Sequence, residues 1–343
     1  MLKHLEALCN IYGVSGDEVS VCDYIIEQIE NNDTIKQYSI DPLGNLIVEK
    51  IGLNRSPKKL MVGAHMDEVG LIITYINEDG TLKFAPVGGI EPSVVLGRTV
   101  VVGSKHIPGV IGSKPIHLLS GKEKDTIPDF SSMYLDIGAK SREDAIEYVS
   151  LGDYVYFNAG FVRLGNGKIR SKALDDRIGC AIMLELIEME LPYDVTFTFH
   201  VQEEIGLRGA KTAAYTVNPD IAIILEATTA SDIADISDEN AVCHLGGGAV
   251  VSFMDRSTIY DKDLYNLAYS ISKEEGIPCQ TKTKIAGGND SGAVHISRGG
   301  VKTIAISAPC RYIHSPSSVV EEKDLDSCLS LTRLLMEKAV LIK

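Results

Sequence analysis

Tryptophan and paired cysteines are both missing from this sequence of 343 residues. Its seven cysteines are scattered along the chain, with no C-x-x-C pair. A disulfide framework or a thiolate zinc site would show paired spacing, so we expect neither. Scattered cysteines are typical of small core residues in a reduced, cytoplasmic protein. Any metal must then be bound by histidine and carboxylate side chains.

Long apolar runs and an excess of basic residues are missing as well. No stretch approaches the roughly 18 uninterrupted apolar residues of a membrane span, and the mean hydropathy is +0.07. Residues 1–6 show no basic stretch leading into an apolar block, so we expect no signal peptide. Lysine and arginine number 33 against 47 acidic residues, which gives a net charge of −14. This balance argues against nucleic-acid and membrane partners.

Two kinds of local pattern divide the chain, whose length predicts about two domains. At both ends, apolar runs of buried-strand type, such as 60–64 and 195–201, alternate with helical patterns. Between them, short β-like segments are separated by glycine and proline at brief intervals, as in a small β-barrel. We therefore predict an α/β fold in which residues 1–69 and 166–343 build one domain, a mixed sheet covered by helices on both faces. Residues 70–165 form an inserted β-rich domain.

Histidines and carboxylates follow the strand-like runs at several places. Glu203 and Glu204 come after the apolar run 195–199, and burying two carboxylates there costs free energy unless a cation compensates them. Taken singly, the other places have structural explanations, such as a loop histidine or acidic residues at a helix N-terminus. Together they predict a two-metal site, because strand ends of an open α/β sheet meet at one edge. The candidates are His65, Asp67, Asp175, Glu203, Glu204, Glu226 and His314.

A two-metal site of this kind points to hydrolysis. Metals roughly 3.5–4 Å apart across a bridging carboxylate lower the pKa of a bridging water and polarise a carbonyl group. Such chemistry suits the cleavage of amides. Histidine and carboxylate ligands accept zinc, cobalt or manganese, so the ligand types leave the metal open.

Five strings of the sequence resemble one known family. The strings GAHMDEVG, KALDDRIGC, VQEEIGLRGA, GGNDSGA and PCRYIHS are similar to those of the tetrahedral (TET-type) metallo-aminopeptidases, which include deblocking and glutamyl aminopeptidases and proteins labelled cellulase M. The likeness runs over nearly the whole chain. It implies a zinc-exopeptidase-like fold, two divalent metal ions per subunit (zinc first, with cobalt or manganese as alternatives) and a dimerisation barrel. It also implies that dimers assemble into a hollow dodecamer open only to short peptides.

The resemblance also implies a role for each candidate residue. Glu203 would be the general base, and Asp67 would orient the neighbouring histidine. We expect Glu203 and Glu204 to reach different positions, because successive side chains of a strand point in opposite directions. Relatives commonly carry aspartate where this sequence has Glu226, and Asp232 and Asp235 lie nearby as alternatives. The metal ligands would be His65, Asp175, Glu204, Glu226 and His314.

The leading prediction is therefore a metal-dependent aminopeptidase that removes N-terminal residues from short peptides. A glycoside hydrolase of endoglucanase type is an alternative, but its usual mechanism needs two carboxylates and no metal. The absence of tryptophan also removes the commonest sugar-stacking side chain. A non-catalytic assembly protein is a further alternative, although the expected ligands and base are all present. The side-chain preference of the enzyme is left open.

Overall fold

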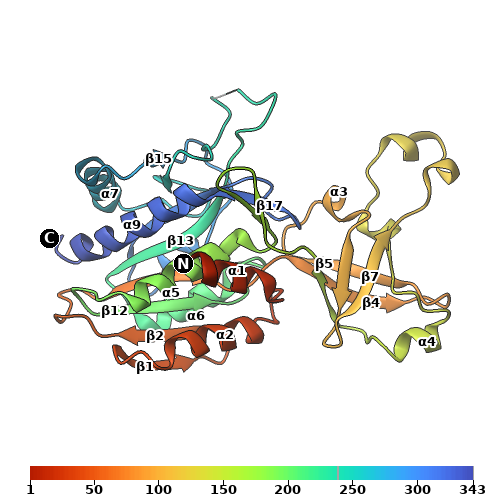
Figure 1. Ribbon diagram of the computed structural model, residues 1–343, viewed down its shortest axis with the longest axis horizontal. Coiled ribbons are helices and arrows are strands. Elements are labelled where there is room, and N and C mark those ends of the chain that lie inside the picture. The colour runs from red at the N-terminus through yellow and green to blue at the C-terminus, as the bar shows by residue number, and fades with distance from the viewer. Residues whose placement is uncertain (238, 343) are drawn as a thin grey trace.

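Both ends of the chain contribute strands to one sheet. The computed structural model describes residues 1–237 and 239–342 (Figure 1). A mixed eight-stranded sheet has the order β1-β2-β12-β3-β13-β16-β14-β15. Strand β3 (Leu60–His65) thus lies between β12 (Val195–His200) and β13 (Ile221–Thr229), which come after the barrel in the chain. The other strands are β1 (Ile35–Ile40), β2 (Leu46–Lys50), β14 (Ala249–Val251), β15 (Cys279–Thr281) and β16 (Lys302–Cys310).

The central strands are apolar at nearly every position because both of their faces are covered. Every residue of β3 and β12 is buried, and β3 pairs in parallel with β12 and β13. Successive side chains serve opposite cores: Val62 packs with the larger core cluster and Met61 with a smaller one. Strand β13 pairs in parallel with β16. The carboxyl ends of these four strands therefore meet at one edge of the sheet.

Helices cover both faces of the sheet, and small residues let one of them approach closely. Helix α6 packs on β12 and β3 through Ala210 and Ala214. A mixed sheet with helices on both faces confirms the predicted α/β fold. One face carries α1 (Leu2–Asn10), α2 (Val19–Ile29), α5 (Leu174–Glu188), α7 (Lys262–Glu275) and α9 (Glu322–Ala339), and the other carries α6 (Arg208–Val217) and α8 (Ser291–Val294).

The middle of the chain forms a closed barrel beside the sheet (Figure 1). Its own core contains Leu71, Val100, Leu135 and Val155. Closure leaves its strands without an unpaired edge, and the predicted small barrel is confirmed. The barrel order is β4 (Gly70–Ile76), β5 (Leu82–Val87), β8 (Tyr134–Asp136), β7 (Ile107–Gly112), β6 (Thr99–Val102) and β9 (Tyr154–Phe157).

The remaining elements, outside the main sheet with its helices and the barrel strands, are short. Within the described residues, no helix is long and apolar enough to cross a bilayer. A small antiparallel sheet joins β10 (Val162–Leu164), β11 (Lys168–Ser171) and β17 (Ser318–Glu321). The barrel region also holds helices α3 (Pro92–Val95) and α4 (Arg142–Ile146) and 3₁₀ turns at Ile116–Leu118, Gly121–Asp125 and Phe130–Ser132.

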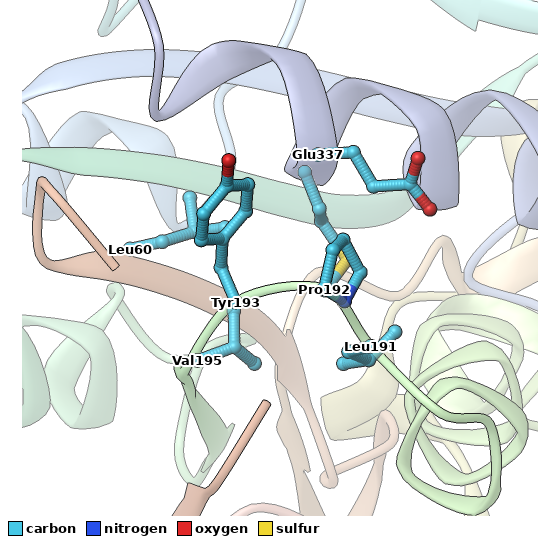
Figure 2. Close-up of a pocket in the computed structure, with 7 residues that line it drawn as sticks. Leu60, Leu191, Pro192, Tyr193, Val195 and Glu337 are labelled. Atoms are coloured by element: carbon cyan, nitrogen blue, oxygen red, sulfur yellow. The ribbon is translucent and has the colours of Figure 1, made fainter. Parts of the chain in front are cut away.

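The amino ends of the central strands lie at the opposite edge of the sheet, where charged side chains such as Lys36, Lys59 and Asp194 line a broad hollow. Figure 2 shows a small pocket there, lined by Leu60 at the start of β3, Val195 at the start of β12 and Tyr193 between them. Its volume of about 10 Å³ leaves room for about one water molecule. A pocket this small is a packing gap rather than a ligand site.

Candidate metal centre

Residues from separate segments meet at the carboxyl edge of the sheet. His65 ends β3, Glu226 lies on β13, and His314 follows β16. Asp175 lies in the first turn of α5, and the pair Glu203–Glu204 follows β12. All of these except His65, which is buried behind them, line one cavity of about 440 Å³. The strand-end rule of open α/β sheets therefore explains why the chain collects them here.

Asp175 lies between the two histidines. Its Oδ1 is 3.3 Å from Nε2 of His65, and its Oδ2 is 3.4 Å from Nε2 of His314. Each oxygen of one carboxylate thus faces a different imidazole. A carboxylate placed in this way could offer one oxygen to each of two cations.

A glutamate accompanies each histidine. Glu226 Oε1 is 3.4 Å from Nε2 of His65, and Glu204 Oε2 is 3.3 Å from Nε2 of His314. Glu203 stands farther off, with its Oε2 4.0 Å from His65 Nε2. The two nearby aspartates considered as alternatives to Glu226 face elsewhere: Asp232 pairs with Arg311 at 2.7 Å, and Asp235 is exposed.

Asp67 holds several groups in place from behind the cluster. It is fully buried, and His65 Nδ1 donates to its carbonyl oxygen at 3.1 Å, leaving Nε2 directed at the cluster. The carboxylate lies slightly farther from that nitrogen, with Oδ1 at 3.4 Å. It accepts hydrogen bonds from the backbone N–H groups of Glu203 at 3.0 Å and Glu204 at 3.1 Å. Asp67 therefore contacts both the histidine and the segment that carries the glutamates.

Asp176, which was not among the predicted site residues, is also part of the cluster. It is fully buried; its Oδ1 accepts from the N–H of Gly179 at 2.9 Å, while its Oδ2 has no hydrogen-bond partner among the described residues. Ligand atoms of Asp176, His65 and Glu226 lie within 4.8 Å of one another, as do those of His65, Asp175 and Glu204. A buried carboxylate oxygen without a partner, among imidazoles and other carboxylates, fits a site for divalent cations.

The acid–base state of the cluster reflects the same crowding. Burial raises the pKa of Glu203 and Glu226 well above the usual range, and it raises the pKa of Glu204 to about 8. Burial alone would lower the pKa of His314, but the hydrogen bond to Asp175 and the charge of Glu204 outweigh it and raise the pKa to about 9. These carboxylates need positive charge beside them to ionise together.

Comparison with known proteins decides the family. The model of the M42 glutamyl aminopeptidase family matches residues 44–331. The chain belongs to the M42 family of aminopeptidases. It is 33% identical to the lysyl aminopeptidase of Pyrococcus furiosus, over 95% of this chain and 94% of that one. It is also 33% identical to the glutamyl aminopeptidase of Lactococcus lactis subsp. cremoris, over 98% of this chain and 96% of that one.

Solved structures agree with this assignment. An aminopeptidase from Desulfurococcus kamchatkensis superimposes with a TM-score of 0.93 at 33% identity, covering 98% of this chain and 94% of that one. The TET1 peptidase of Pyrococcus horikoshii, which assembles into a tetrahedron or an octahedral shell, gives 0.85 at 34% identity and covers 98% of each chain. A Thermotoga maritima protein described as an endoglucanase gives 0.81 at 35%, covering 98% and 97%. The predicted TET-type resemblance and metal-dependent aminopeptidase activity are confirmed.

This M42 enzyme should release protons when it binds its metal. At pH 7 the raised pKa values of His314 (about 9) and Glu204 (about 8) mean that the pair holds at least one proton without metal, whereas a metal ligand must be deprotonated. Metal affinity should therefore fall as the pH falls below these pKa values. Calorimetric titration of metal-stripped enzyme with zinc at pH 7, in two buffers of different ionisation enthalpy, should give different heats. Equal heats would show that no net proton is released and would contradict the assignment of these groups as ligands.

Proposed function

We propose that this enzyme removes N-terminal residues from short peptides by means of two divalent metal ions, zinc first and cobalt or manganese as alternatives. The observation that carries the proposal is the position of Asp175, with one oxygen toward His65 and the other toward His314. Glu226 beside His65 and Glu204 beside His314 complete one donor group for each ion. Asp67 would hold His65 in its orientation from behind.

The proposed mechanism assigns proton transfer to Glu203. Two divalent ions bound by these residues would supply Lewis acidity that lowers the pKa of a water and polarises the scissile carbonyl. Glu203 lines the cavity, and it is the glutamate that stands farther from the histidines. Its carboxylate would take a proton from the attacking water and deliver it to the nitrogen of the leaving amine. Burial raises the pKa of Glu203 well above the usual range, so the positive charge of bound cations would be needed to keep its carboxylate ionised and able to accept that proton.

Substrate panels test this function against its alternatives. We expect hydrolysis of aminoacyl-p-nitroanilides that stops in the presence of a chelator and returns when metal is added. A cellulose oligomer should stay intact under both conditions. Cleavage of the oligomer, insensitive to chelator, would favour a glycoside hydrolase. Inactivity on both substrates with metal present would favour an assembly protein.

We propose further that the enzyme prefers an acidic N-terminal residue. The relatives named for glutamyl and for lysyl substrates are both 33% identical to this chain, so their names do not decide which N-terminal residue this enzyme prefers. Lys282 is the one lysine or arginine among the described residues that line the cavity, and within the described chain it forms no ion pair. Every acidic lining residue belongs to the metal cluster. With that cluster neutralised by cations, Lys282 leaves the remaining wall positive and suited to a carboxylate.

Replacing Lys282 with alanine should lower kcat/KM for a glutamyl anilide roughly tenfold or more, because a hydrogen bond to a charged group is lost. Activity on a leucyl anilide should change by less than about threefold. Lys284→Ala is the matched control, since Lys284 lies two residues away, contacts Asn240 at 3.3 Å and does not line the cavity. An unchanged glutamyl-to-leucyl ratio in Lys282→Ala, or a wild-type preference for lysyl anilide, would contradict the proposal.

The enzyme's partners, in this proposal, are short peptides and further copies of itself. We propose that residues 70–165 form a dimerisation domain inserted into a catalytic domain of residues 1–69 and 166–343, and that dimers build a tetrahedral dodecamer. The connection between β7 and β8 extends from the barrel (Figure 1) and exposes Ile116, Leu118 and Ile127 by 73%, 56% and 65%. Exposed apolar groups of this kind favour association.

Light scattering of metal-loaded enzyme should give the mass of a large assembly rather than that of one 37.1 kDa chain. A monomer under these conditions would contradict the assembly. A dimer in chelator would not, because metal is expected to support assembly.

We also propose a cytoplasmic location, consistent with the seven free cysteines.

A further inference from the structure

Two buried carboxylates hold the backbone of the segment that carries the glutamates. Glu18 Oε1 accepts from the N–H of Gln202 at 3.0 Å, while Asp67 accepts from Glu203 at 3.0 Å and from Glu204 at 3.1 Å. Three consecutive amides are therefore fixed by side chains. Strand β12 ends at His200, and Gln202 has a φ of 57°, so strand pairing does not hold these three amides.

The N-terminal loop, residues 12–18, supplies one of these carboxylates and supports the other. Ser15 Oγ donates to Asp67 Oδ2 at 2.6 Å, and the N–H of Gly16 donates to Glu18 Oε1 at 2.8 Å. Ser15 is 2% exposed and Glu18 is 6% exposed, so water does not compete readily for these hydrogen bonds. The loop thus reaches the glutamate segment through two independent connections.

The barrel fixes the same loop from its other side. Tyr156 on β9 donates its hydroxyl to the carboxylate of Asp17, and its ring stacks on Tyr12 with centroids 4.9 Å apart. Gly16 has a φ of +96°, and a Cβ there would lie 2.4 Å from the hydroxyl oxygen of Tyr154. The N-terminal loop is therefore held between the barrel and the metal cluster, which gives Ser15 and Glu18 fixed positions.

We propose that Ser15 and Glu18 are positioning residues of the peptidase reaction, an inference that rests on the proposed role of Glu203. They fix the 202–204 backbone, and through it the direction in which the Glu203 carboxylate enters the cavity. A displacement of about 1 Å in a reacting group can cost roughly a hundredfold in rate. Glu203 lines the cavity, whereas Ser15 and Glu18 do not. A peptide bound in the cavity should therefore not need these two residues for its affinity, and their loss should lower kcat rather than raise KM.

Four variants test this role. Glu18→Ala removes the acceptor for Gln202, whereas Glu18→Gln keeps an oxygen acceptor of the same size. Ser15→Ala removes the hydroxyl that binds Asp67. Ser327→Ala is the control, because Ser327 is a buried serine on α9 that donates to the carbonyl of Lys323, away from the cluster.

We expect Glu18→Ala and Ser15→Ala to lower kcat on a leucyl anilide roughly tenfold to a hundredfold, as losses of supporting hydrogen bonds do. KM should stay within about twofold and bound metal at the wild-type level, while Glu18→Gln stays within about threefold of wild-type kcat. If Glu18→Ala does not fold, as judged by circular dichroism, Ser15→Ala carries the same test.

A wild-type kcat in both Glu18→Ala and Ser15→Ala would overturn the inference. So would a Glu18→Gln variant as slow as Glu18→Ala, or a loss in Ser327→Ala as large as in Ser15→Ala. These outcomes are distinct from failure of the proposed function, in which the wild-type enzyme itself would hydrolyse no aminoacyl anilide with metal present.

Discussion

Glu203→Gln should keep its bound metal and lose at least about a hundredfold in kcat, which is the scale of general-base catalysis. Glutamine has the same size, so it preserves the cavity, but its amide cannot accept the proton from the attacking water. Glu203 Oε2 is 4.0 Å from the nearest histidine nitrogen, compared with 3.3 Å for Asp175 and 3.4 Å for Glu226. Elemental analysis together with kcat on a leucyl or glutamyl anilide measures both expectations.

The neighbouring glutamate provides the matched control. Glu204 Oε2 lies 3.3 Å from His314 Nε2, as expected of a ligand to the second metal. Glu204→Gln should therefore weaken one metal site, and excess metal should restore part of the activity. If Glu203→Gln instead lost metal, while Glu204→Gln kept its metal and stayed inactive, the two roles would have to be exchanged.

Asp175→Asn should have the largest effect of all, a loss of at least about a thousandfold in activity, or about 4 kcal/mol of transition-state stabilisation. Asparagine keeps one oxygen but replaces the other with an amide NH₂ group, whose nitrogen has no lone pair free to bind a cation. Since each Asp175 oxygen faces a different histidine, the bridge between the two donor groups is lost. Metal content should fall, and excess metal should not restore activity.

Asp232→Asn is the control for this substitution. Asp232 follows the carboxyl end of β13, but its carboxylate pairs with Arg311 rather than with the cluster. Its metal content should match that of the wild type. An Asp175→Asn enzyme with full metal and wild-type activity would show that Asp175 does not bridge the metals.

The residues of the candidate site could be collected from the sequence because they follow strand ends. His65, Glu226 and His314 each come at or just beyond an apolar run, and such runs are readable because buried parallel strands have no polar face. The barrel is predictable for a similar reason, since frequent glycine and proline mark its short strands. The sequence could therefore reach the fold class and the candidate ligands.

Features that depend on which residues become neighbours in the folded chain could not be predicted from the sequence. Asp176 looks like a helix-terminal acid in the sequence, and its burial beside His65 and Glu226 appears only when β3, β13 and α5 meet. The expectation that Glu203 and Glu204 diverge because they continue a strand has a wrong premise: β12 ends at His200. They reach different histidines because backbone hydrogen bonds to Asp67 set the direction of the segment.

Helix α6 was also missed by sequence reasoning. Its sequence, RGAKTAAYTV, contains few large apolar residues, so the usual helical spacing of such residues is weak. In the structure, its alanines pack directly against the sheet, and a Cβ at the neighbouring Gly209 would lie 2.4 Å from the carbonyl oxygen of Val201. Signals based on large hydrophobic residues fail at such close helix–sheet contacts.

The central claim is that this chain's histidine and carboxylate cluster works only with two bound metal ions. The most direct measurement titrates metal-stripped enzyme with zinc or cobalt and follows leucyl and glutamyl anilide hydrolysis together with bound metal. We predict no activity without metal and full activity when two ions are bound per subunit. Full activity in the stripped enzyme, or saturation with a single ion, would contradict the account.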